Sequence, residues 1–184
     1  LADDYDYNVE ALARTERWAQ RSLDEHKKHY MDLGYYQALY GVIQGGRWED
    51  LRRSTCKKMA EMDFDGYGLG GAFLKEDLSE ILRWCNEELP ENKPRHLLGL
   101  SHPDDILNGV KMGADTFDCV APTREGRHGK LYTPTGVINL QKFMDSPLMI
   151  DENCDCPTCQ AGYTLGQLRK LWKSQDKEEK YKYF

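Results

Sequence analysis

The sequence carries a cluster of cysteines with the spacing of metal ligands. The cluster has the pattern C-x-C-x2-C and consists of Cys154, Cys156 and Cys159. Thiolates are preferred ligands of Zn²⁺, and a closed structural zinc site normally has four ligands. Clustered cysteines favour a metal site in a reducing compartment over a secreted disulfide framework. The pattern therefore predicts a structural zinc site, and reduced cysteines that only support the fold are the alternative.

Asp118 is the carboxylate best placed for covalent or acid–base chemistry. It lies in the run DTFDCV, which is typical of a short buried strand. Between the apolar Phe117 and Val120, its side chain is expected to be partly desolvated and to point into a pocket. Such a group can act as a nucleophile or a general base. A helix or turn cap is the alternative role.

Glycine pairs follow two other predicted strands and suggest a pocket for a flat ligand. Gln44 precedes Gly45-Gly46, and Gly70-Gly71 closes the next strand. Glycine lets a ligand approach the backbone closely and leaves N–H groups accessible as donors. Either pair alone would indicate a tight turn, whereas two pairs at equivalent positions favour a shared pocket.

A basic stretch interrupts an acidic chain. The formal net charge is -6, yet residues 122–132 contain Arg124, Arg127 and Lys130 against only Glu125. Net charge mainly informs about solubility, while local clusters decide contacts with phosphate. Residues 167–182 are also rich in Lys and Arg, for which a solvated helix face is the simpler interpretation. The first stretch is therefore a candidate for contact with nucleic acid.

Helix-like and strand-like segments alternate along the chain. We expect strands at residues 36–43, 64–69, 95–100 and 115–120, and helices at 8–29, 48–62, 77–89 and 103–112. This alternation predicts an α/β fold with parallel strands and right-handed crossovers. These units make up about half of a (β/α)8 barrel, in which chemistry gathers at the carboxyl ends of the strands. We expect a partial barrel at residues 1–145 and a zinc-binding segment with a C-terminal helix at residues 146–184.

Composition fits an ordinary globular protein. Hydrophobic residues make up 40% and charged residues 30% of the chain. No apolar run approaches the ~20 residues that cross a bilayer, and no basic, apolar leader opens the chain. We therefore expect a cytoplasmic location and no membrane contact.

The motifs, taken in order, resemble those of the bacterial tRNA-guanine transglycosylases, the queuine tRNA-ribosyltransferases. The resemblance runs from about Arg14 to the end of the chain, and its most specific part is Asp118 to Gly129. The motifs are GVIQGG (41–46), FDGYGLGG (64–71), FDCVAPTREGRHG (117–129) and CDCPTC (154–159).

The resemblance implies an exchange reaction on tRNA. Guanine at the anticodon wobble position is replaced by a 7-deazaguanine base, with 7-aminomethyl-7-deazaguanine (preQ1) favoured over queuine. Asp118 matches the nucleophile, which attacks C1′ and forms a covalent ribosyl-enzyme ester. Gln44 and Gly71 match positions that bind the base, and Arg124 and Arg127 match positions that engage the anticodon loop. The cysteine cluster matches a structural zinc site whose fourth ligand, a histidine, would fall just beyond the last residue.

Some family features are changed or unmatched. Ala72 and Leu98 stand where the family tends to have leucine and methionine, and both keep the pocket apolar. Glu76 aligns with a residue beside the 7-substituent of the base. Homodimerisation is plausible, although Gly162 and Gly166 stand where bacterial members often have an aromatic contact. The family's general acid/base Asp matches no residue of this chain, so we expect little turnover from the chain alone.

Two other functions compete with the enzyme fragment. One is a non-catalytic paralogue or subunit that holds tRNA or a partner through the cysteine region, Arg124 and Arg127. The other is an unrelated barrel enzyme that uses Asp118 as a base, which predicts no role for the cysteines. Retention of Asp118 together with Gln44 and Gly71 favours the transglycosylase, because a pure binder needs no nucleophile in a base pocket.

Overall fold

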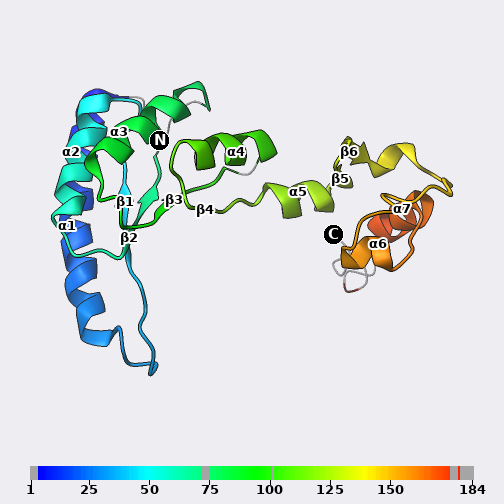
Figure 1. The fold of residues 1–184 in the computed structure, drawn as a ribbon, viewed down its shortest axis with the longest axis horizontal. Coiled ribbons are helices and arrows are strands. Elements are labelled where there is room, and N and C mark those ends of the chain that lie inside the picture. Colours follow the sequence, from blue (N-terminus) through cyan, green and yellow to red (C-terminus); the bar gives the residue numbers. More distant parts are fainter. Residues whose placement is uncertain (1–3, 72–74, 101, 175–177, 179–184) are drawn as a thin grey trace. The chain divides into compact units, whose positions relative to one another are not determined.

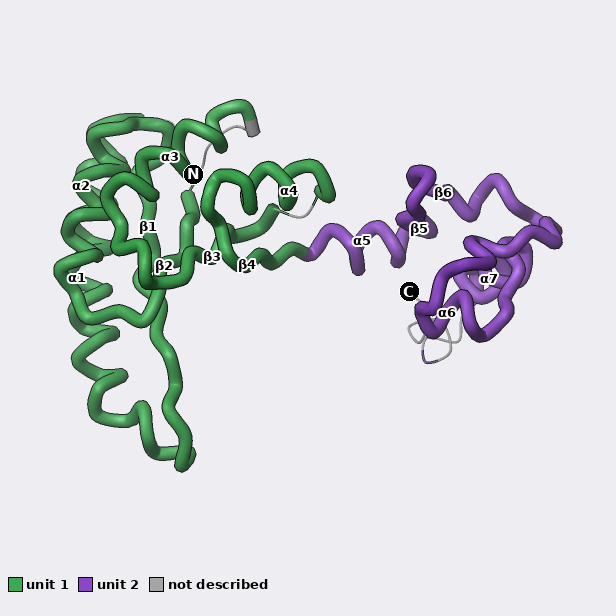
Figure 2. The backbone as a smooth tube through the Cα atoms, in the orientation of Figure 1, with its two compact units in different colours: residues 1–119 green, residues 120–184 purple. Residues whose placement is uncertain are grey.

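The computed structural model describes residues 4–71, 75–100, 102–174 and 178 of the chain (Figure 1). The chain divides into two compact units, residues 1–119 and residues 120–184 (Figure 2). Each unit has its own hydrophobic core, and each is described by itself.

The first unit is an α/β structure around one parallel sheet. Its order is β1-β2-β3-β4, so each strand pairs with the next strand along the chain. The strands are β1 (Tyr40–Ile43), β2 (Gly66–Leu69), β3 (Arg95–Leu97) and β4 (Thr116–Phe117). The helices are α1 (Tyr5–His29), α2 (Glu49–Ala60), η1 (Lys75–Asp77, 3-10), α3 (Leu78–Glu88) and α4 (Pro103–Lys111). The expected alternation of helices with parallel strands is confirmed.

Residues of β1, β2 and β3 alternate between two unlike faces of the sheet. Ile43, Leu69 and Leu97 are fully buried, and they pack in one core with apolar residues of α2 and α3. Tyr40 and Val42 alternate with Ile43 on β1 and remain 37% and 38% exposed. The helices therefore cover one face of the sheet, and the other face keeps accessible side chains at β1.

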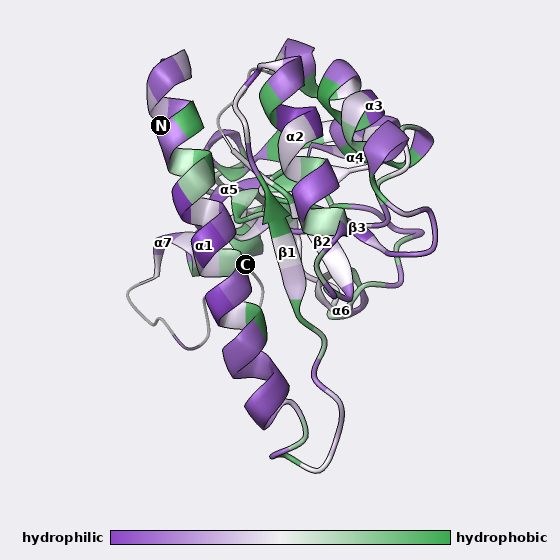
Figure 3. Ribbon diagram, turned by 90° about the vertical axis from the view of Figure 1, so that its left-hand side faces the viewer, coloured by the Kyte–Doolittle hydropathy of each residue, from purple (hydrophilic) through white to green (hydrophobic). Residues whose placement is uncertain are grey.

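The amino-terminal helix contributes little to this core. Asp4 caps α1 by accepting a hydrogen bond from the backbone N of Tyr7 at 2.7 Å, which satisfies one of the free donors of the first turn. Only Leu12 and Leu23 are buried among its residues. Figure 3 shows the carboxyl half of α1 as hydrophilic on nearly all of its surface.

The second unit combines a hairpin with short helices. Its elements are α5 (Ala121–Arg127), β5 (Lys130–Thr133), β6 (Gly136–Asn139), η2 (Leu140–Lys142, 3-10), α6 (Pro157–Gln160) and α7 (Leu165–Lys173). Leu140, Leu168 and Trp172 lie in its core. A Cβ atom on Gly166 would stand 2.9 Å from the backbone of Ser146. Glycine therefore lets α7 approach that segment closely, which is a structural reason for the residue inside a helix.

Several elements differ from the sequence-based expectations. The strands expected at 36–43, 95–100 and 115–120 are shorter in the structure. In the first of them, residues 36–39 have no sheet partner. Asp65 instead accepts hydrogen bonds from the Tyr36 hydroxyl and from the backbone N of Leu39. Helix α5 and the β5–β6 hairpin were not expected, since the stretch from residue 121 is rich in charged and turn-forming residues. Ala72 and Ser101, next to predicted strand ends, lie outside the described residues.

Within the described ranges, no helix is both long and apolar enough to cross a membrane.

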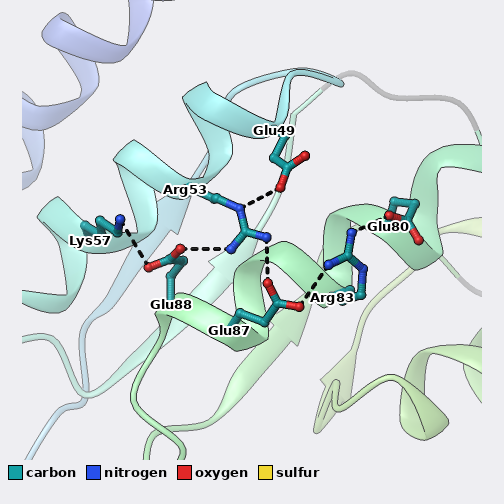
Figure 4. Close-up of polar contacts among 7 residues, drawn as sticks. All are labelled: Glu49, Arg53, Lys57, Glu80, Arg83, Glu87 and Glu88. Atoms are coloured by element: carbon teal, nitrogen blue, oxygen red, sulfur yellow. Dashed lines mark hydrogen bonds and ion pairs between the residues drawn. The ribbon is translucent and has the colours of Figure 1, made fainter.

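An ion-pair network joins α2 to α3 on their outer surface. Arg53 donates hydrogen bonds to Glu49, Glu87 and Glu88 at 2.8, 2.6 and 2.8 Å (Figure 4). Arg83 adds bonds to Glu80 and Glu87. The bonds from Arg53 and then Arg83 lower the pKa of the Glu87 carboxyl below its ordinary value of 4.5. Its ionised form is therefore favoured in the folded protein.

We predict that Arg53→Gln lowers the midpoint of thermal unfolding at pH 7. A carboxyl whose pKa is depressed on folding stabilises the protein above its unfolded pKa, and this contribution disappears as pH falls through the folded pKa. The difference between variant and wild type should therefore shrink below about pH 4 and in high salt. Arg21→Gln, on exposed α1, is the control. A pH-independent difference would contradict the electrostatic origin.

Candidate functional site

The carboxyl ends of the four strands place the candidate site residues in one row. The register aligns Ile43, Leu69, Leu97 and Phe117 across the sheet. Since side chains alternate along a strand, the next residues face away from the helix-covered core. The backbone N of Gly70 and of Leu98 continue the pairing by donating to Ile43 O and Leu69 O. The row following the strand ends is Gln44, Gly70, Leu98 and Asp118.

A buried arginine holds the two glycine loops at these strand ends. Arg52 of α2 has no solvent exposure. Its guanidinium group donates to the carbonyl oxygens of Gly46, Gly70 and Ile43 at 2.8, 2.6 and 3.4 Å. Burial lowers the pKa of Arg52, yet a guanidinium group remains protonated in proteins. The charge is thus offset by carbonyl dipoles, and it joins the ends of β1 and β2.

Gly71 lies beside Gln44 in a conformation that favours glycine. Its φ is +100°, and a Cβ atom there would stand 3.0 Å from the Arg52 guanidinium group and 3.8 Å from Gln44 Cα. The predicted pairing of Gln44 with Gly71 in space is therefore present. Gln44 also lines a hollow of about 740 Å³ between α1 and β1. An amide side chain and nearby backbone groups at one edge suit the polar edge of a flat ligand.

Asp118 follows the end of β4 and is held through one oxygen. Its Oδ1 accepts a hydrogen bond from the backbone N of Gly99 at 3.1 Å and lies 3.2 Å from Nε2 of His96. The side chain is 58% exposed. Its apolar neighbours cover it only in part, because Phe117 packs on the core and Val120 is itself 66% exposed. Asp118 is thus accessible, and like Gln44 it lies at the carboxyl ends of the strands.

The predicted RNA-contacting arginines lie on α5 in the second unit. Arg124 and Arg127 are exposed and one helical turn apart, so both side chains emerge on the same side of the helix. The backbone carbonyl of Arg127 accepts a bond of 2.8 Å from the indole N–H of Trp172. This contact anchors α5 to α7.

The three clustered cysteines converge on one point. The sulfur atoms of Cys154, Cys156 and Cys159 all lie within 4.8 Å of one another. A tetrahedral zinc with bonds of about 2.3 Å requires sulfur separations of about 3.8 Å, so small side-chain movements would bring the three thiolates onto one ion. The donor set therefore fits zinc.

Local contacts give the cysteines different acidities. The backbone N–H of Cys159 donates to the Cys156 sulfur at 3.5 Å and lowers the pKa of that thiol. Burial, followed by contact with Cys156, raises the pKa of Cys159 to about 12. Binding a metal would require Cys159 to lose this proton, so metal affinity should increase with pH.

Sequence reasoning missed two residues of this site. Arg52 is one of several charged residues in an amphipathic helix, and nothing in its local sequence marks it as buried. His96 lies within the strand-like run 95–100 and was given no role. Its place two residues before Leu98, on a strand with period-2 alternation, is the signal that could have put it on the face of Asp118. Glu76, which the resemblance placed beside the ligand, is exposed in η1.

Comparison with known proteins identifies relatives across nearly the whole chain. The family model of queuine tRNA-ribosyltransferase (TGT) matches residues 1–178. The queuine tRNA-ribosyltransferase of Lawsonia intracellularis is 41% identical over 178 residues, which cover 94% of this chain and 47% of that protein. That of Streptococcus equi subsp. zooepidemicus is 41% identical over 177 residues, covering 94% and 45%. That of Pediococcus pentosaceus is 40% identical over 179 residues, covering 95% and 46%. The chain spans about half the length of these relatives.

We predict that Arg52→Met destabilises the protein by about 2–4 kcal/mol, because it leaves buried carbonyl groups without a charged donor. Urea unfolding followed by circular dichroism measures the change. Arg21→Met, at an exposed position of α1, should change the free energy of unfolding by less than about 0.5 kcal/mol. An equally small effect at Arg52 would show that the glycine loops do not depend on it.

We predict that the chain purified in zinc-containing medium carries about one zinc ion, and that Cys156→Ser removes most of it. Elemental analysis of the protein after dialysis provides the measurement. Cys119→Ser, in the first unit, is the matched control and should retain the metal. Equal zinc content in both variants would exclude the cluster as the binding site.

Proposed function

The chain belongs to the queuine tRNA-ribosyltransferase family, and we propose that it is the carboxyl-terminal half of a tRNA-guanine transglycosylase with Asp118 as its nucleophile. The observation that carries this proposal is the position of Asp118 in the strand-end row that also contains Gln44. One carboxylate oxygen is held by the protein. In the part of the chain that the structure describes, no hydrogen bond reaches the other oxygen, Oδ2.

The proposed reaction needs an accessible carboxylate beside a base-binding edge. Asp118 Oδ2 attacks C1′ of the wobble nucleotide, the bond from C1′ to guanine breaks, and a ribosyl ester forms. A 7-deazaguanine base then attacks C1′ and releases the carboxylate. This route splits one difficult displacement into two steps, as in retaining glycosidases. The Gln44 amide and the Gly71 N–H read the polar edge of the base.

We assign the remaining parts of the chain to support of this chemistry. Residues 1–145 form about half of a (β/α)8 barrel, and residues 146–184 form the metal-binding segment. Arg124 and Arg127 contact the anticodon loop of tRNA, because planar guanidinium groups suit phosphate oxygens and splayed bases. Zinc, held by Cys154, Cys156 and Cys159, serves only to fix the fold of this segment.

The half-length of the chain bears on how it acts. Strand β1 is an end strand of the sheet, and the hollow beside it leaves room for a further barrel strand to pair there. The general acid/base group of the family matches no residue of this chain, so turnover requires an upstream half.

We predict that Asp118→Asn in the full-length protein abolishes the covalent protein–RNA adduct. The amide keeps the shape of the carboxylate but is a far weaker nucleophile, so the rate of adduct formation should fall on the order of 10³-fold or more. Denaturing electrophoresis with an anticodon stem-loop carrying a wobble guanine detects the adduct. Asp104→Asn, an equal charge change at a 79%-exposed position of α4, is the control.

The outcomes separate the two functions that remain in play. An adduct that persists in Asp118→Asn would remove Asp118 from the mechanism. A wild-type protein that binds the stem-loop but forms no adduct under any condition would favour the non-catalytic tRNA-binding paralogue.

A further inference from the structure

A histidine and a threonine accompany Asp118 on the helix-free face of the sheet. His96 lies at the middle of β3, between the buried residues Arg95 and Leu97, and its register partner on β4 is Thr116. Both therefore belong to the row of side chains immediately before that of Asp118. The imidazole is 24% exposed, whereas Asp118 is 58% exposed. The histidine is thus the less accessible of the two side chains.

Both ring nitrogens of His96 have partners, Thr116 on β4 and Asp118 directly after β4. Nε2 lies 3.2 Å from Asp118 Oδ1, and Nδ1 lies 2.8 Å from the hydroxyl oxygen of Thr116. An ionised carboxylate only accepts hydrogen bonds, so Nε2 must carry a proton in this contact. In the neutral ring, Nδ1 is then an acceptor, and the Thr116 hydroxyl donates to it. The contact with the carboxylate therefore sets the ring tautomer, and the Thr116 hydroxyl, which can donate or accept, holds the ring at Nδ1.

The hydrogen bonds to Asp118 involve only one of its two carboxylate oxygens. His96 and the Gly99 N–H both donate to Oδ1, and among the described residues Oδ2 accepts no hydrogen bond. Two donors on one oxygen fix the rotation of the carboxylate about its Cβ–Cγ bond. The remaining oxygen carries no hydrogen bond from the described residues, so it is the one available to an incoming sugar carbon.

From this arrangement we propose that His96 is a positioning residue for Asp118, with Thr116 holding the imidazole ring through Nδ1. The inference rests on the proposed function. During attack, Oδ2 forms the bond to C1′ while Oδ1 becomes the carbonyl oxygen of the ester, and it retains the hydrogen bonds from His96 and Gly99. No proton passes between His96 and Asp118 in this step, because His96 donates throughout. The electron pair of the broken bond leaves with guanine, and the proton that guanine takes up comes from the general acid/base group that matches no residue of this chain. In the second step the same donors receive the carboxylate as it leaves.

The geometry predicts a kinetic effect confined to the chemical steps. His96→Leu fills the same space without a donor and should slow covalent adduct formation by about 10²-fold, the typical cost of a misplaced reacting group. The dissociation constant for the stem-loop should stay within about twofold. His96→Gln can present an amide N–H to the same oxygen and should recover most of the lost rate. Thr116→Val should cause a smaller loss of about tenfold, because it removes only the hydrogen bond that holds the ring at Nδ1.

A spectroscopic measurement tests the contact without requiring activity. Nitrogen-15 NMR of the chain, recorded where the ring is neutral, should show His96 protonated at Nε2 and unprotonated at Nδ1, and Asp118→Asn should change this tautomer ratio. The signals of His29, which has carboxylate neighbours on exposed α1, should not respond. His29→Leu is the matched control for the kinetic series, and thermal unfolding verifies that each variant is folded.

The results separate this inference from the proposed function. If the wild-type protein forms no adduct, the proposed function fails, whereas the NMR tautomer still reports on the contact. If the wild type forms the adduct and His96→Leu forms it at the same rate, the positioning role is excluded. Equal losses in His96→Leu and His96→Gln would also overturn the role of the donated hydrogen bond, as would a dominant tautomer protonated at Nδ1.

Discussion

The buried guanidinium group of Arg52 fixes the relative position of the β1 and β2 strand ends, on which the candidate site is built. A buried cation is costly unless it is well hydrogen-bonded, and here the partners are backbone carbonyls of both loops. Their oxygens cannot move away without leaving the charge unsolvated. This requirement gives Gln44 and Gly71 a defined spacing. Asp118 lies at the same carboxyl end of the sheet, because the four strands pair continuously.

Asp118 is arranged for reaction in a different way from a buried catalytic carboxylate. Its exposure leaves water around the carboxylate, and this water shields its charge. The protein controls its orientation, since the donors from β3 and the loop after it converge on one oxygen. Under the proposed function, displacement of water from the other oxygen falls to the bound nucleotide and to barrel elements outside this chain. Orientation and desolvation are then supplied by different parts of the enzyme.

Local sequence pattern was informative where a feature depends on neighbouring residues. The alternation of strands and helices, the glycine pairs and the cysteine spacing were all readable, because each depends on period or spacing along the chain. Arg52 and His96 were not, because their roles depend on contacts between elements distant in sequence. The strand ends were overestimated for a related reason: residues 36–39 have strand-like composition, but Asp65 satisfies the backbone N of Leu39 in place of a strand partner. The boundary between the two units was likewise not visible in composition.

The left-handed backbone at Gly71 also limits how this surface can diversify. Any side chain at Gly71 would be strained in this backbone conformation and would crowd the Arg52 guanidinium group. Nearly all substitutions there should therefore be rejected, both in natural evolution and in directed evolution. Changes in ligand preference therefore have to come from positions whose side chains are not constrained by such contacts. Leu98, which lies in the middle of the row and is 40% exposed, is the clearest of these positions. A library intended to alter ligand preference would therefore randomise Leu98 and leave the glycine loops untouched.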